Sequence, residues 1–427
     1  MSRIIFPVAT LFGLFGMNQA QTENPTLQLN EDDNFSFQLL SALALAPYGG
    51  SDIAPVLAAA TELEAGNFTS YSNSFYSLAN STKEAALDPD NSYDPVNVRD
   101  AWFAAATYFR QADFYLHGDW TDPLIETLWD EQLEAFDHAI AALPIPGRRI
   151  EISADNFTIE AIWYAASGDK AKRPTMIVGN GYDGAQEDLY STIVVPALAR
   201  GWNCITYEGP GQPTVRRRQQ LGFIPDWERV VTPVVDYVLT EESAVVDPSS
   251  LVLFGFSFGG YLAARAAAFE PRLSAVVLDG GIYDAFEAFS SQLPPEALEL
   301  FDSGNKTAFD GAILSAVSEP DTPTTLRWGV EQGTWAFKIK SPFDFLESTK
   351  EYTIKDVVDR IDMPVLVMDA EFETFFAGQA EQVSKALGSR GTYHVFKGEA
   401  GYHCQLGAFQ ELNRVMFAWI HKKLGSC

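Results

Sequence analysis

The sequence contains few basic residues and few cysteines, and both shortages exclude some classes of protein. Its 427 residues hold 29 lysines and arginines against 57 acidic residues, a formal net charge of -28. Such a charge repels phosphate backbones and anionic lipids, so we expect no nucleic-acid partner. The three cysteines, Cys204, Cys404 and Cys427, are too few and too scattered for a disulfide framework, and whether two of them pair stays open.

Long apolar runs are also missing. One apolar segment, residues 4–17, follows Arg3 and leads to the small residue Ala20 and then to a polar stretch. It is too short to span a bilayer, and its layout is typical of a secretory signal peptide over residues 1–20. No other stretch has the length of a membrane-spanning helix, so we expect a secreted protein without a membrane partner.

Five N-x-S/T sequons agree with export, because asparagine in this pattern is the acceptor of N-linked glycans in secreted proteins. Each sequon is a short pattern and is weak alone. The five predicted glycosylation sites are Asn34, Asn67, Asn80, Asn156 and Asn305.

The chain divides at a proline-rich break. From residue 34 to the break the signals are helical only, with apolar residues at three- and four-residue spacing in 97–116 and 124–143. Residues 143–147, Leu-Pro-Ile-Pro-Gly, cannot continue a helix. We therefore predict an N-terminal helical module over residues 34–146 and a second domain over residues 147–427.

Beyond the break, short apolar segments alternate with helical ones. The segments predicted as strands are residues 158–165, 175–178, 204–207, 251–254, 275–278, 365–368 and 393–396. The segments predicted as helices are residues 188–199, 227–239, 259–269, 379–387 and 405–422. Nearly continuous apolar strands that alternate with helices are typical of a doubly wound, mostly parallel sheet, so the predicted fold class is α/β.

One segment interrupts this rhythm. Residues 282–358 contain no clear strand and are rich in phenylalanine, tryptophan and proline. Such folds bind ligands at the carboxyl ends of the strands, and we predict that this insertion is a helical lid over that edge. Its aromatic residues indicate an apolar small-molecule substrate, although most of them will belong to the core.

The segment Gly255-Phe256-Ser257-Phe258-Gly259 follows a strand and opens an alanine-rich helix. A serine held in a sharp strand-to-helix turn crowds the residues two before and two after it, so both must be small, and both are glycine. The turn exposes the hydroxyl and points a helix N-terminus at the reacting carbonyl, where it stabilises developing negative charge. Ser257 is the predicted nucleophile, and an ordinary Gly-Ser turn is the alternative.

A serine nucleophile needs a neighbouring base, normally histidine, and the chain has five histidines. Two fall in the predicted N-terminal helices, one is inside the last strand, and one is in the basic end of the last helix. His403 alone stands in the loop after the final strand. We assign it as the base, with a solvated loop histidine as the alternative.

The third member must be a carboxylate that orients the imidazole and stabilises its cation. The candidates after the strand 365–368 are Asp369, Glu371 and Glu373. The acid falls three residues after the small residue that ends the strand, which is Ala370, so Glu373 is favoured and Asp369 is the alternative. The resulting order of nucleophile, acid and base along the chain is that of α/β-hydrolases.

An oxyanion hole needs two backbone N–H donors, one from the residue after the serine and one from the loop after the third strand. Phe258 supplies the first. For the second, the glycine-rich turn in residues 177–184 leaves a buried strand and offers the amide of Tyr182. The next residue, Asp183, is either a turn-forming residue before Gly184 or a catalytic one.

Two other motifs indicate no separate function. The glycines of residues 207–212 have a spacing found in phosphate-binding loops, but the Gly-Lys-Ser/Thr ending is missing. We interpret this segment as a structural turn near the site and expect neither a cofactor nor a metal. Arg216-Arg217-Arg218 is the only basic run, and we interpret it as solvated surface.

Four segments resemble the α/β-hydrolases related to 2,6-dihydroxypseudooxynicotine hydrolase, which include fungal members associated with polyketide clusters. They are Asn180-Gly-Tyr-Asp-Gly, Glu208-Gly-Pro-Gly-Gln, Gly255-Phe-Ser-Phe-Gly-Gly and Gly401-Tyr-His-Cys. The resemblance covers residues 35–425 and implies hydrolysis of an ester or of a carbon–carbon bond beside a ketone. It also implies an extra acidic residue near the oxyanion turn, which Asp183 would match.

Together these features predict a secreted serine hydrolase that acts on an apolar carbonyl compound, such as a polyketide-type secondary metabolite. Two alternatives stay open: an acyltransferase or cyclase that uses the same serine, and a non-catalytic binding protein. The oligomeric state also stays open, with a homodimer among the alternatives.

Overall fold

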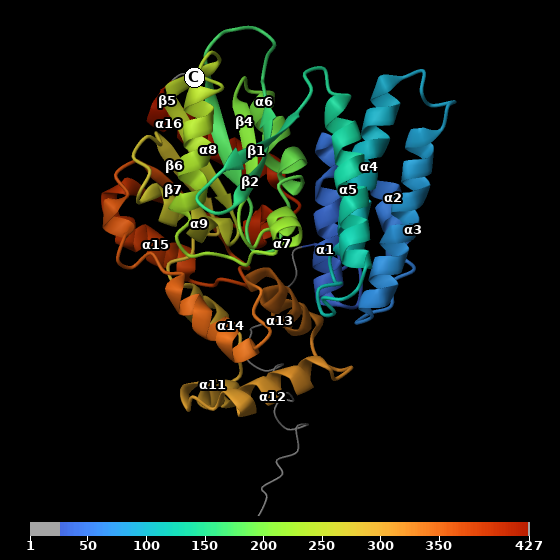
Figure 1. Cartoon of the computed structure of the whole chain (residues 1–427), viewed down its shortest axis with the longest axis vertical. Coiled ribbons are helices and arrows are strands. Elements are labelled where there is room, and N and C mark those ends of the chain that lie inside the picture. Colours follow the sequence, from blue (N-terminus) through green and yellow to red (C-terminus); the bar gives the residue numbers. More distant parts are fainter. Residues whose placement is uncertain (1–25, 426–427) are drawn as a thin grey trace, which may run out of the picture.

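The structure is a computed structural model that describes residues 26–425. In Figure 1 a layer of helices from the N-terminal part of the chain stands beside a sheet that is covered by further helices. The predicted signal peptide, residues 1–20, and Cys427 lie outside the described residues, so what the sequence predicts for them stays a prediction.

The N-terminal layer of the described chain contains five α-helices. They are α1 (Asp33–Ala44), α2 (Ile53–Ala60), α3 (Phe68–Leu87), α4 (Pro95–Asp113) and α5 (Leu124–Ala141). Side-chain oxygens of Asp32, Asn67 and Asp94 cap the starts of α1, α3 and α4. Helices α4 and α5 match the two helical segments predicted at residues 97–116 and 124–143.

The second part of the described chain contains one eight-stranded sheet. Its strands are β1 (Arg148–Ser153), β2 (Thr158–Tyr164), β3 (Arg173–Gly179), β4 (Asn203–Glu208), β5 (Val246–Phe256), β6 (Ala275–Asp279), β7 (Val365–Ala370) and β8 (Gly391–Phe396). Their order is β1-β2-β4-β3-β5-β6-β7-β8. Strand β2 pairs antiparallel with β1 and β4, and all other pairs are parallel. The predicted α/β class with a mostly parallel sheet is confirmed.

Both faces of the sheet are buried, because successive residues of a strand point to opposite sides. On β3, Ile177 packs into one core, whereas Met176 and Val178 pack into another that also contains the N-terminal helices. The helices that cover the sheet are α6 (Val195–Leu198), α8 (Glu228–Thr240), α9 (Gly259–Ala267), α15 (Gln379–Leu387) and α16 (Phe409–Leu424). Burial on both faces explains why the strands are nearly continuous apolar runs in the sequence.

The helix predicted over residues 188–199 is divided in the structure. A π-helical turn, Tyr190–Val194, precedes the short α6. Pro196 has no N–H group to donate to the carbonyl of Thr192. The side-chain amide of Asn413 in α16 donates to that carbonyl instead, at 2.9 Å, so the break in the helix joins it to the C-terminal helix.

Between β6 and β7 the chain forms a helical insertion. Its helices are α10 (Ala285–Ser290), α11 (Pro295–Asp302), α12 (Lys306–Val317), α13 (Thr324–Phe337) and α14 (Pro342–Ser348). Figure 1 shows α11 to α14 below the sheet, at one end of the molecule. Short 3-10 turns complete the described chain at Ala46–Tyr48, Thr349–Glu351, Val358–Arg360, Gly388–Arg390, Gly398–Ala400 and His403–Gln405.

The arginine run is not solvated surface, and that interpretation is wrong. It lies in α7 (Pro213–Gln219), where Arg216 and Arg217 are buried. Arg217 donates to both carboxylate oxygens of Asp113 in α4, at 2.7 and 2.8 Å. Only Arg218 is exposed, where it pairs with Asp130. A run of like charges shows nothing of burial, which here depends on a partner distant in the sequence.

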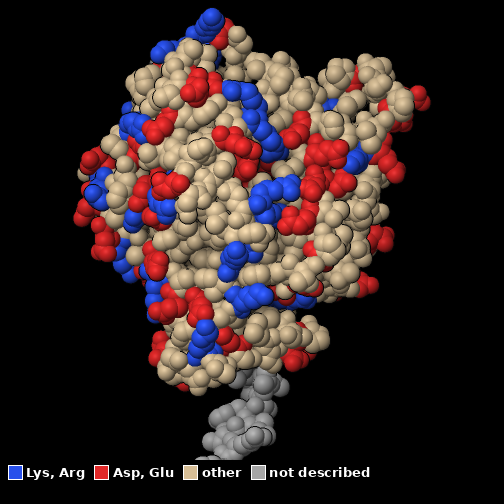
Figure 2. All heavy atoms as spheres, viewed as in Figure 1, with Lys and Arg blue, Asp and Glu red and all other residues tan. Residues whose placement is uncertain are grey.

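The outer surface carries most of the charge. Figure 2 shows acidic side chains spread over the visible face, with basic ones lying among them. Within residues 26–425, none of the helices combines the length and the apolar character that crossing a bilayer requires.

Candidate active site

Ser257 stands in a strained turn between β5 and α9. Its φ is +59°, a left-handed conformation that is unfavourable for a residue with a side chain. Its amide donates to the carbonyl of Asp279 at 2.7 Å, which helps to hold the turn. A Cβ atom on Gly255 would collide with the carbonyl of Gly259, and one on Gly259 would lie 2.8 Å from the carbonyl of Asn180. The flanking glycines are therefore a steric requirement.

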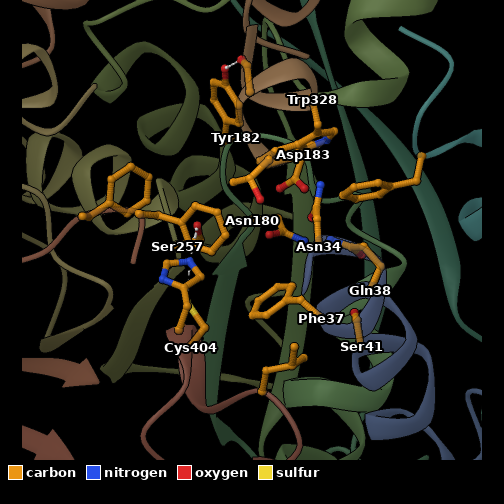
Figure 3. A pocket seen from close by; sticks show the side chains of 18 of the residues that line it. Asn34, Phe37, Gln38, Ser41, Asn180, Tyr182, Asp183, Ser257, Trp328 and Cys404 are labelled. Carbon is orange, nitrogen blue, oxygen red and sulfur yellow. Dashed lines mark hydrogen bonds between the residues drawn. The ribbon is translucent and has the colours of Figure 1, made fainter. Parts of the chain in front are cut away.

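Three side chains that are distant in sequence form one hydrogen-bonded chain beside the pocket shown in Figure 3. His403 Nε2 lies 2.8 Å from Ser257 Oγ, and His403 Nδ1 lies 2.5 Å from Glu373 Oε2. The other carboxylate oxygen of Glu373 accepts from the amides of Phe375 and Phe376, at 2.8 and 3.1 Å. The structure thus brings together the residues that the sequence predicts as nucleophile, base and acid.

The two alternative acids have other partners. Asp369 accepts from the hydroxyl of Tyr393 at 2.6 Å, and Glu371 accepts from the amide of Gly398 at 2.9 Å. Neither carboxylate makes a hydrogen bond to His403 in the described chain. The geometry therefore favours Glu373.

Burial and neighbouring charges shift the pKa values of His403 and Glu373 in opposite directions. Burial favours the neutral imidazole, but the carboxylates of Glu373, Asp279 and Asp183 outweigh it and raise the pKa of His403. For Glu373, burial favours the acid form, but the imidazole and two backbone N–H donors outweigh it and lower the pKa. An ionised Glu373 can thus orient the imidazole and stabilise its cation.

Asp279, at the end of β6, is a second buried carboxyl next to the histidine loop. Burial raises its pKa to about 8. Its backbone carbonyl accepts from the Ser257 amide and from the Cys404 thiol, and its carboxyl accepts from the side-chain amide of Gln405 at 3.0 and 3.3 Å. Asp279 therefore joins the nucleophile turn to the histidine loop. Asp279 is not among the residues predicted from the sequence, where its one signal is an acidic residue at the end of an apolar strand.

Two backbone amides near Ser257 are available to an oxyanion. In the described chain, neither the Tyr182 amide nor the Phe258 amide donates a hydrogen bond, whereas the amide of Gly181 donates to the side chain of Asn180 at 2.8 Å. A Cβ atom on Gly181 would lie 2.7 Å from the Phe258 nitrogen, so the two turns are in contact. Free donors on adjoining turns suit the stabilisation of an oxyanion.

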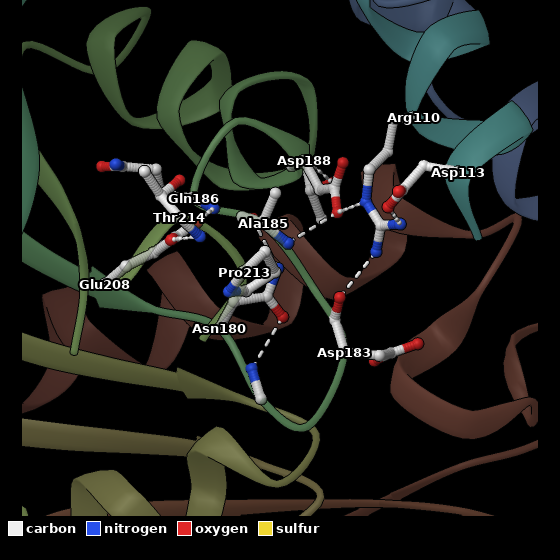
Figure 4. A network of polar contacts seen from close by, with 12 residues as sticks. Arg110, Asp113, Asn180, Asp183, Ala185, Gln186, Asp188, Glu208, Pro213 and Thr214 are labelled. Carbon is white, nitrogen blue, oxygen red and sulfur yellow. Dashed lines mark hydrogen bonds and ion pairs between the residues drawn. The ribbon is translucent and has the colours of Figure 1, made fainter. Parts of the chain in front are cut away.

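The turn that carries Tyr182 is held by helices from outside the sheet. Arg110 of α4 donates to the backbone carbonyl of Asp183 at 2.6 Å, as Figure 4 shows. Gln332 of α13 donates to the carbonyl of Tyr182 at 3.2 Å, and the Tyr182 hydroxyl donates to the carbonyl of Gly329 at 2.8 Å. Both the N-terminal layer and the insertion therefore position this turn.

The turn after β4 supports the same region from the other side. Gln212 donates to the carbonyl of Asn180 at 2.7 Å. The buried carboxylate of Glu208 accepts from the amides of Gln186 and Thr214, at 3.0 and 2.6 Å, in the network shown in Figure 4. The residues 207–212 thus form a structural turn beside the site.

A cavity of about 370 Å³ lies over Ser257. Its walls come from three parts of the chain: helices α1 and α4, the loops that follow β3, β5, β7 and β8, and the insertion. Many of its side chains are apolar, among them Phe37, Phe114, Phe256, Phe289, Trp328, Phe345, Phe375 and Leu406. The Asp183 side chain also lines the cavity, where burial raises its pKa although Arg110 opposes the shift.

One predicted glycosylation site also lines this cavity. Asn34 lies in the first turn of α1, is only 5% exposed, and faces the pocket in Figure 3. A glycan on it is incompatible with this fold, so that prediction is wrong, because a sequon contains no information on burial. Asn67, Asn156 and Asn305 are exposed, and Asn80 is half-buried.

The two cysteines in the described chain, Cys204 and Cys404, are buried free thiols and form no disulfide with each other. Cys404 Sγ lies 3.4 Å from His403 Nε2, and burial raises its pKa. Within residues 26–425, no group of three or more His, Cys, Asp or Glu side chains is arranged to hold a metal ion.

Comparisons with known proteins support the α/β-hydrolase fold. The profile of a family described as "Alpha/beta hydrolase family" matches residues 176–403, slightly more than half of the chain. The chain is 29% identical over 410 residues to Hydrolase LUC6 of Fusarium sp, covering 92% of this chain and 96% of that protein. It is 28% identical over 408 residues to 20-hydroxy-prefusarin hydrolase FUS2 of Gibberella moniliformis, covering 91% and 96%.

Among solved structures, the fold resembles that of 2,6-dihydroxy-pseudo-oxynicotine hydrolase, with a TM-score of 0.71 at 18% identity. The match covers 90% of this chain and 96% of the other, so the likeness includes the N-terminal helical layer as well as the sheet. The resemblance drawn from the four sequence segments is confirmed at the level of the fold.

Proposed function

Because the chain belongs to the alpha/beta hydrolase family, we propose that it is a serine hydrolase with Ser257, His403 and Glu373 as its catalytic triad. One observation carries this proposal: the continuous hydrogen-bonded chain from Ser257 Oγ through His403 to Glu373, with contacts of 2.8 and 2.5 Å. Its serine is in the left-handed turn that exposes a nucleophile, and it faces a cavity large enough for a small molecule.

In this mechanism His403 Nε2 takes the proton from Ser257 Oγ while the oxygen attacks a substrate carbonyl. Glu373 stabilises the imidazolium, and the amides of Tyr182 and Phe258 donate to the oxyanion. His403 then passes the proton to the leaving group, which leaves an acyl group on the serine. Water, deprotonated by the same histidine, releases the acid and restores the serine.

We further propose that the substrate is an apolar carbonyl compound, of the polyketide type found in secondary metabolism, cleaved at an ester or at a carbon–carbon bond beside a ketone. The aromatic lining of the cavity supports an apolar substrate. One relative is named for the hydrolysis of 20-hydroxy-prefusarin, which supports a small organic molecule.

Asp183 is the candidate accessory acid in this proposal. Its carboxyl lines the cavity and makes no hydrogen bond to another residue of the described chain. Its raised pKa favours the protonated form, which can donate to a carbonyl or to a carbon leaving group. Cleavage of a carbon–carbon bond needs such a donor more than cleavage of an activated ester does.

The first test is the Ser257→Ala variant, assayed against short p-nitrophenyl esters and aryl diketones. We expect turnover to fall at least about a thousandfold, because only binding and oxyanion contributions remain. Ser303→Ala, at an exposed position after α11, is the matched control and should keep wild-type turnover. Equal turnover in Ser257→Ala and wild type would contradict the mechanism.

A fluorophosphonate probe gives an independent readout, since it should label the wild type and Ser303→Ala but not Ser257→Ala. Product analysis in ¹⁸O-labelled water then separates hydrolysis from the alternatives. Hydrolysis places the label in the released acid, whereas transfer to an alcohol or ring closure by the same serine does not.

A further inference from the structure

Helix α1 presents a row of polar side chains to the otherwise largely apolar cavity. Asn34, Gln38 and Ser41 are spaced at i, i+4 and i+7, so they follow one another along one side of the helix for about 10 Å. All three line the cavity, and Figure 3 shows them on the α1 wall. Asn34 and Gln38 are 5% and 7% exposed.

Within residues 26–425, these side chains have no hydrogen-bond partner. In the described chain, no hydrogen bond involves the side-chain amides of Asn34 and Gln38 or the hydroxyl of Ser41, and the Asn34 Nδ2 atom is fully buried without an acceptor. Buried polar groups are nearly always paired, and an unpaired one lowers stability. Where unpaired groups line a cavity, a bound ligand can pair with them, and functional sites are where proteins depart from full pairing.

The helix cannot turn this row toward solvent. On an adjoining side of the helix, the ring of Phe35 packs against Tyr71 and Tyr115, with centroid distances of 4.9 and 5.2 Å. Its N-cap residue, Asp32, accepts a hydrogen bond from Thr324 at the start of α13, at 2.8 Å. Helix α1 is therefore held by both the N-terminal layer and the insertion, and the row is a preorganised surface.

We propose that Asn34, Gln38 and Ser41 recognise the oxygen pattern of the substrate. The substrate is then an elongated, apolar carbonyl compound with at least one further ketone or hydroxyl group, set away from the carbonyl that Ser257 attacks. This inference rests on the proposed function, which places the scissile carbonyl at Ser257.

The chemistry of the row decides the kind of group that it binds. Asparagine and glutamine each offer a donor and an acceptor, and serine offers both through its hydroxyl, so ketones and hydroxyls can be bound. None of the three carries a charge, so the row suits neutral groups better than a carboxylate or an ammonium ion. A substrate without such oxygens would cover the row and leave it unpaired, which is a strong ground for rejection.

The experiment uses the full chain and a set of ester probes: p-nitrophenyl octanoate and its analogues with one ketone at each successive position of the acyl chain. The wild type should prefer one or two of the ketone analogues over the octanoate in kcat/KM. The variants Asn34→Leu, Gln38→Met and Ser41→Ala remove the polar groups with little change of shape. For the residue that contacts the ketone in the wild type, substitution should lower this preference about tenfold or more.

The thermal midpoint gives a second readout, because a structural role and a binding role predict opposite results. If the row serves the substrate, the variants should unfold at the wild-type temperature or above it, since an unpaired buried group is lost. The control is Ser36→Ala on the same helix, whose hydroxyl accepts from the amide of Leu29 at 3.0 Å and does not line the cavity. It should lower the midpoint and keep the wild-type preference.

The outcomes separate this inference from the proposal on which it rests. A wild type without preference, or row variants that keep the preference and lose stability as Ser36→Ala does, would overturn the inference and leave the proposed function standing. Hydrolysis that persists in Ser257→Ala, or no hydrolysis of any probe by the wild type, would overturn the proposed function and the inference with it.

Discussion

Two buried carboxyl groups near His403 differ in their surroundings, and at the scale of single residues these differences separate their pKa values. Glu373 contacts the imidazole and two backbone N–H donors, and its pKa is lowered. Asp279 is buried, and burial outweighs the charge of the nearby imidazole, so its pKa is raised to about 8. Environments that separate the pKa values of neighbouring acids assign them different roles.

Glu373→Gln should slow turnover and change its pH dependence. Only neutral His403 can accept the serine proton, so kcat/KM rises with pH through the pKa of His403. The Glu373 carboxylate raises that pKa, and its removal should move the acid limb to lower pH while the rate falls on the order of a thousandfold. Ester hydrolysis from about pH 5 to 9 measures both effects. Asp369→Asn is the control and should change neither the rate nor the pH of the acid limb. The same shift of the acid limb in that variant would make Asp369 the acid.

Asp279→Asn should stabilise the protein increasingly from about pH 4 to pH 8. The unfolded carboxyl ionises near its ordinary pKa of 3.8, whereas burial holds the folded pKa at about 8. Between these values the folded state holds a proton that the unfolded state has lost, so wild-type stability falls as pH rises, by at most about 1.4 kcal/mol per pH unit.

Asparagine does not titrate, and it keeps an acceptor oxygen for Gln405. Urea unfolding of both proteins across this pH range measures the difference in the free energy of unfolding. A difference that does not depend on pH would show that Asp279 ionises normally in the folded state.

At the scale of elements, helices from outside the sheet hold the turns of the site. Helices α4 and α13 hold the turn of Tyr182, and α13 also donates a hydrogen bond to the N-cap residue of α1. The same principle joins α4 to α7, where Arg217 and Asp113 pair in the buried boundary between the N-terminal layer and the sheet. Loss of one of these contacts should therefore change the position of the turn that it holds.

Asp113→Asn should lower the free energy of unfolding by about 3–5 kcal/mol, because Arg217 would remain buried without its counter-charge. Burial disfavours the Asp113 carboxylate, but Arg217, His117 and Arg110 outweigh it and hold its pKa well below the ordinary value. Urea denaturation measures the loss. The control, Asp130→Asn, breaks the exposed pair with Arg218 and should cost less than about 1 kcal/mol. Equal losses in the two variants would mean that the buried pair contributes no more than a surface pair.

At the scale of the whole molecule, the cavity belongs to no single part of the chain. The N-terminal layer, the sheet and the insertion each supply a wall, so the helices that precede the sheet in the sequence take part in the site. We propose in addition that the protein is secreted, which the segment 1–20 and three exposed sequons support.

Secretion from a yeast or filamentous fungus should place glycans on Asn67, Asn156 and Asn305 and none on Asn34. The first three are exposed, whereas Asn34 faces the cavity. Enzymatic release of the glycans in ¹⁸O-labelled water, followed by mass spectrometry of the peptides, identifies each occupied asparagine. A glycan on Asn34 would contradict the position of α1, and an intact segment 1–20 with no glycans would contradict secretion.

The sequence by itself determined the features that depend on neighbouring residues. Short apolar segments located strands β2 to β8, and α15 begins and ends at the predicted residues, 379 and 387. The glycines around Ser257 predicted its turn, because steric crowding within five residues requires them. Counting from the end of a strand selected Glu373, but the same count left Asp369 open.

Only the tertiary structure decided which of these groups meet. It turned Asp369 toward Tyr393 and Glu373 toward His403, and it paired Arg217 with Asp113. It also turned the polar row of α1 into the cavity, where the sequence indicates only a glycosylation signal and an ordinary helix. The physical reason is that a local pattern shows which side of an element is apolar, whereas burial, pairing and pKa depend on what the rest of the chain places against it.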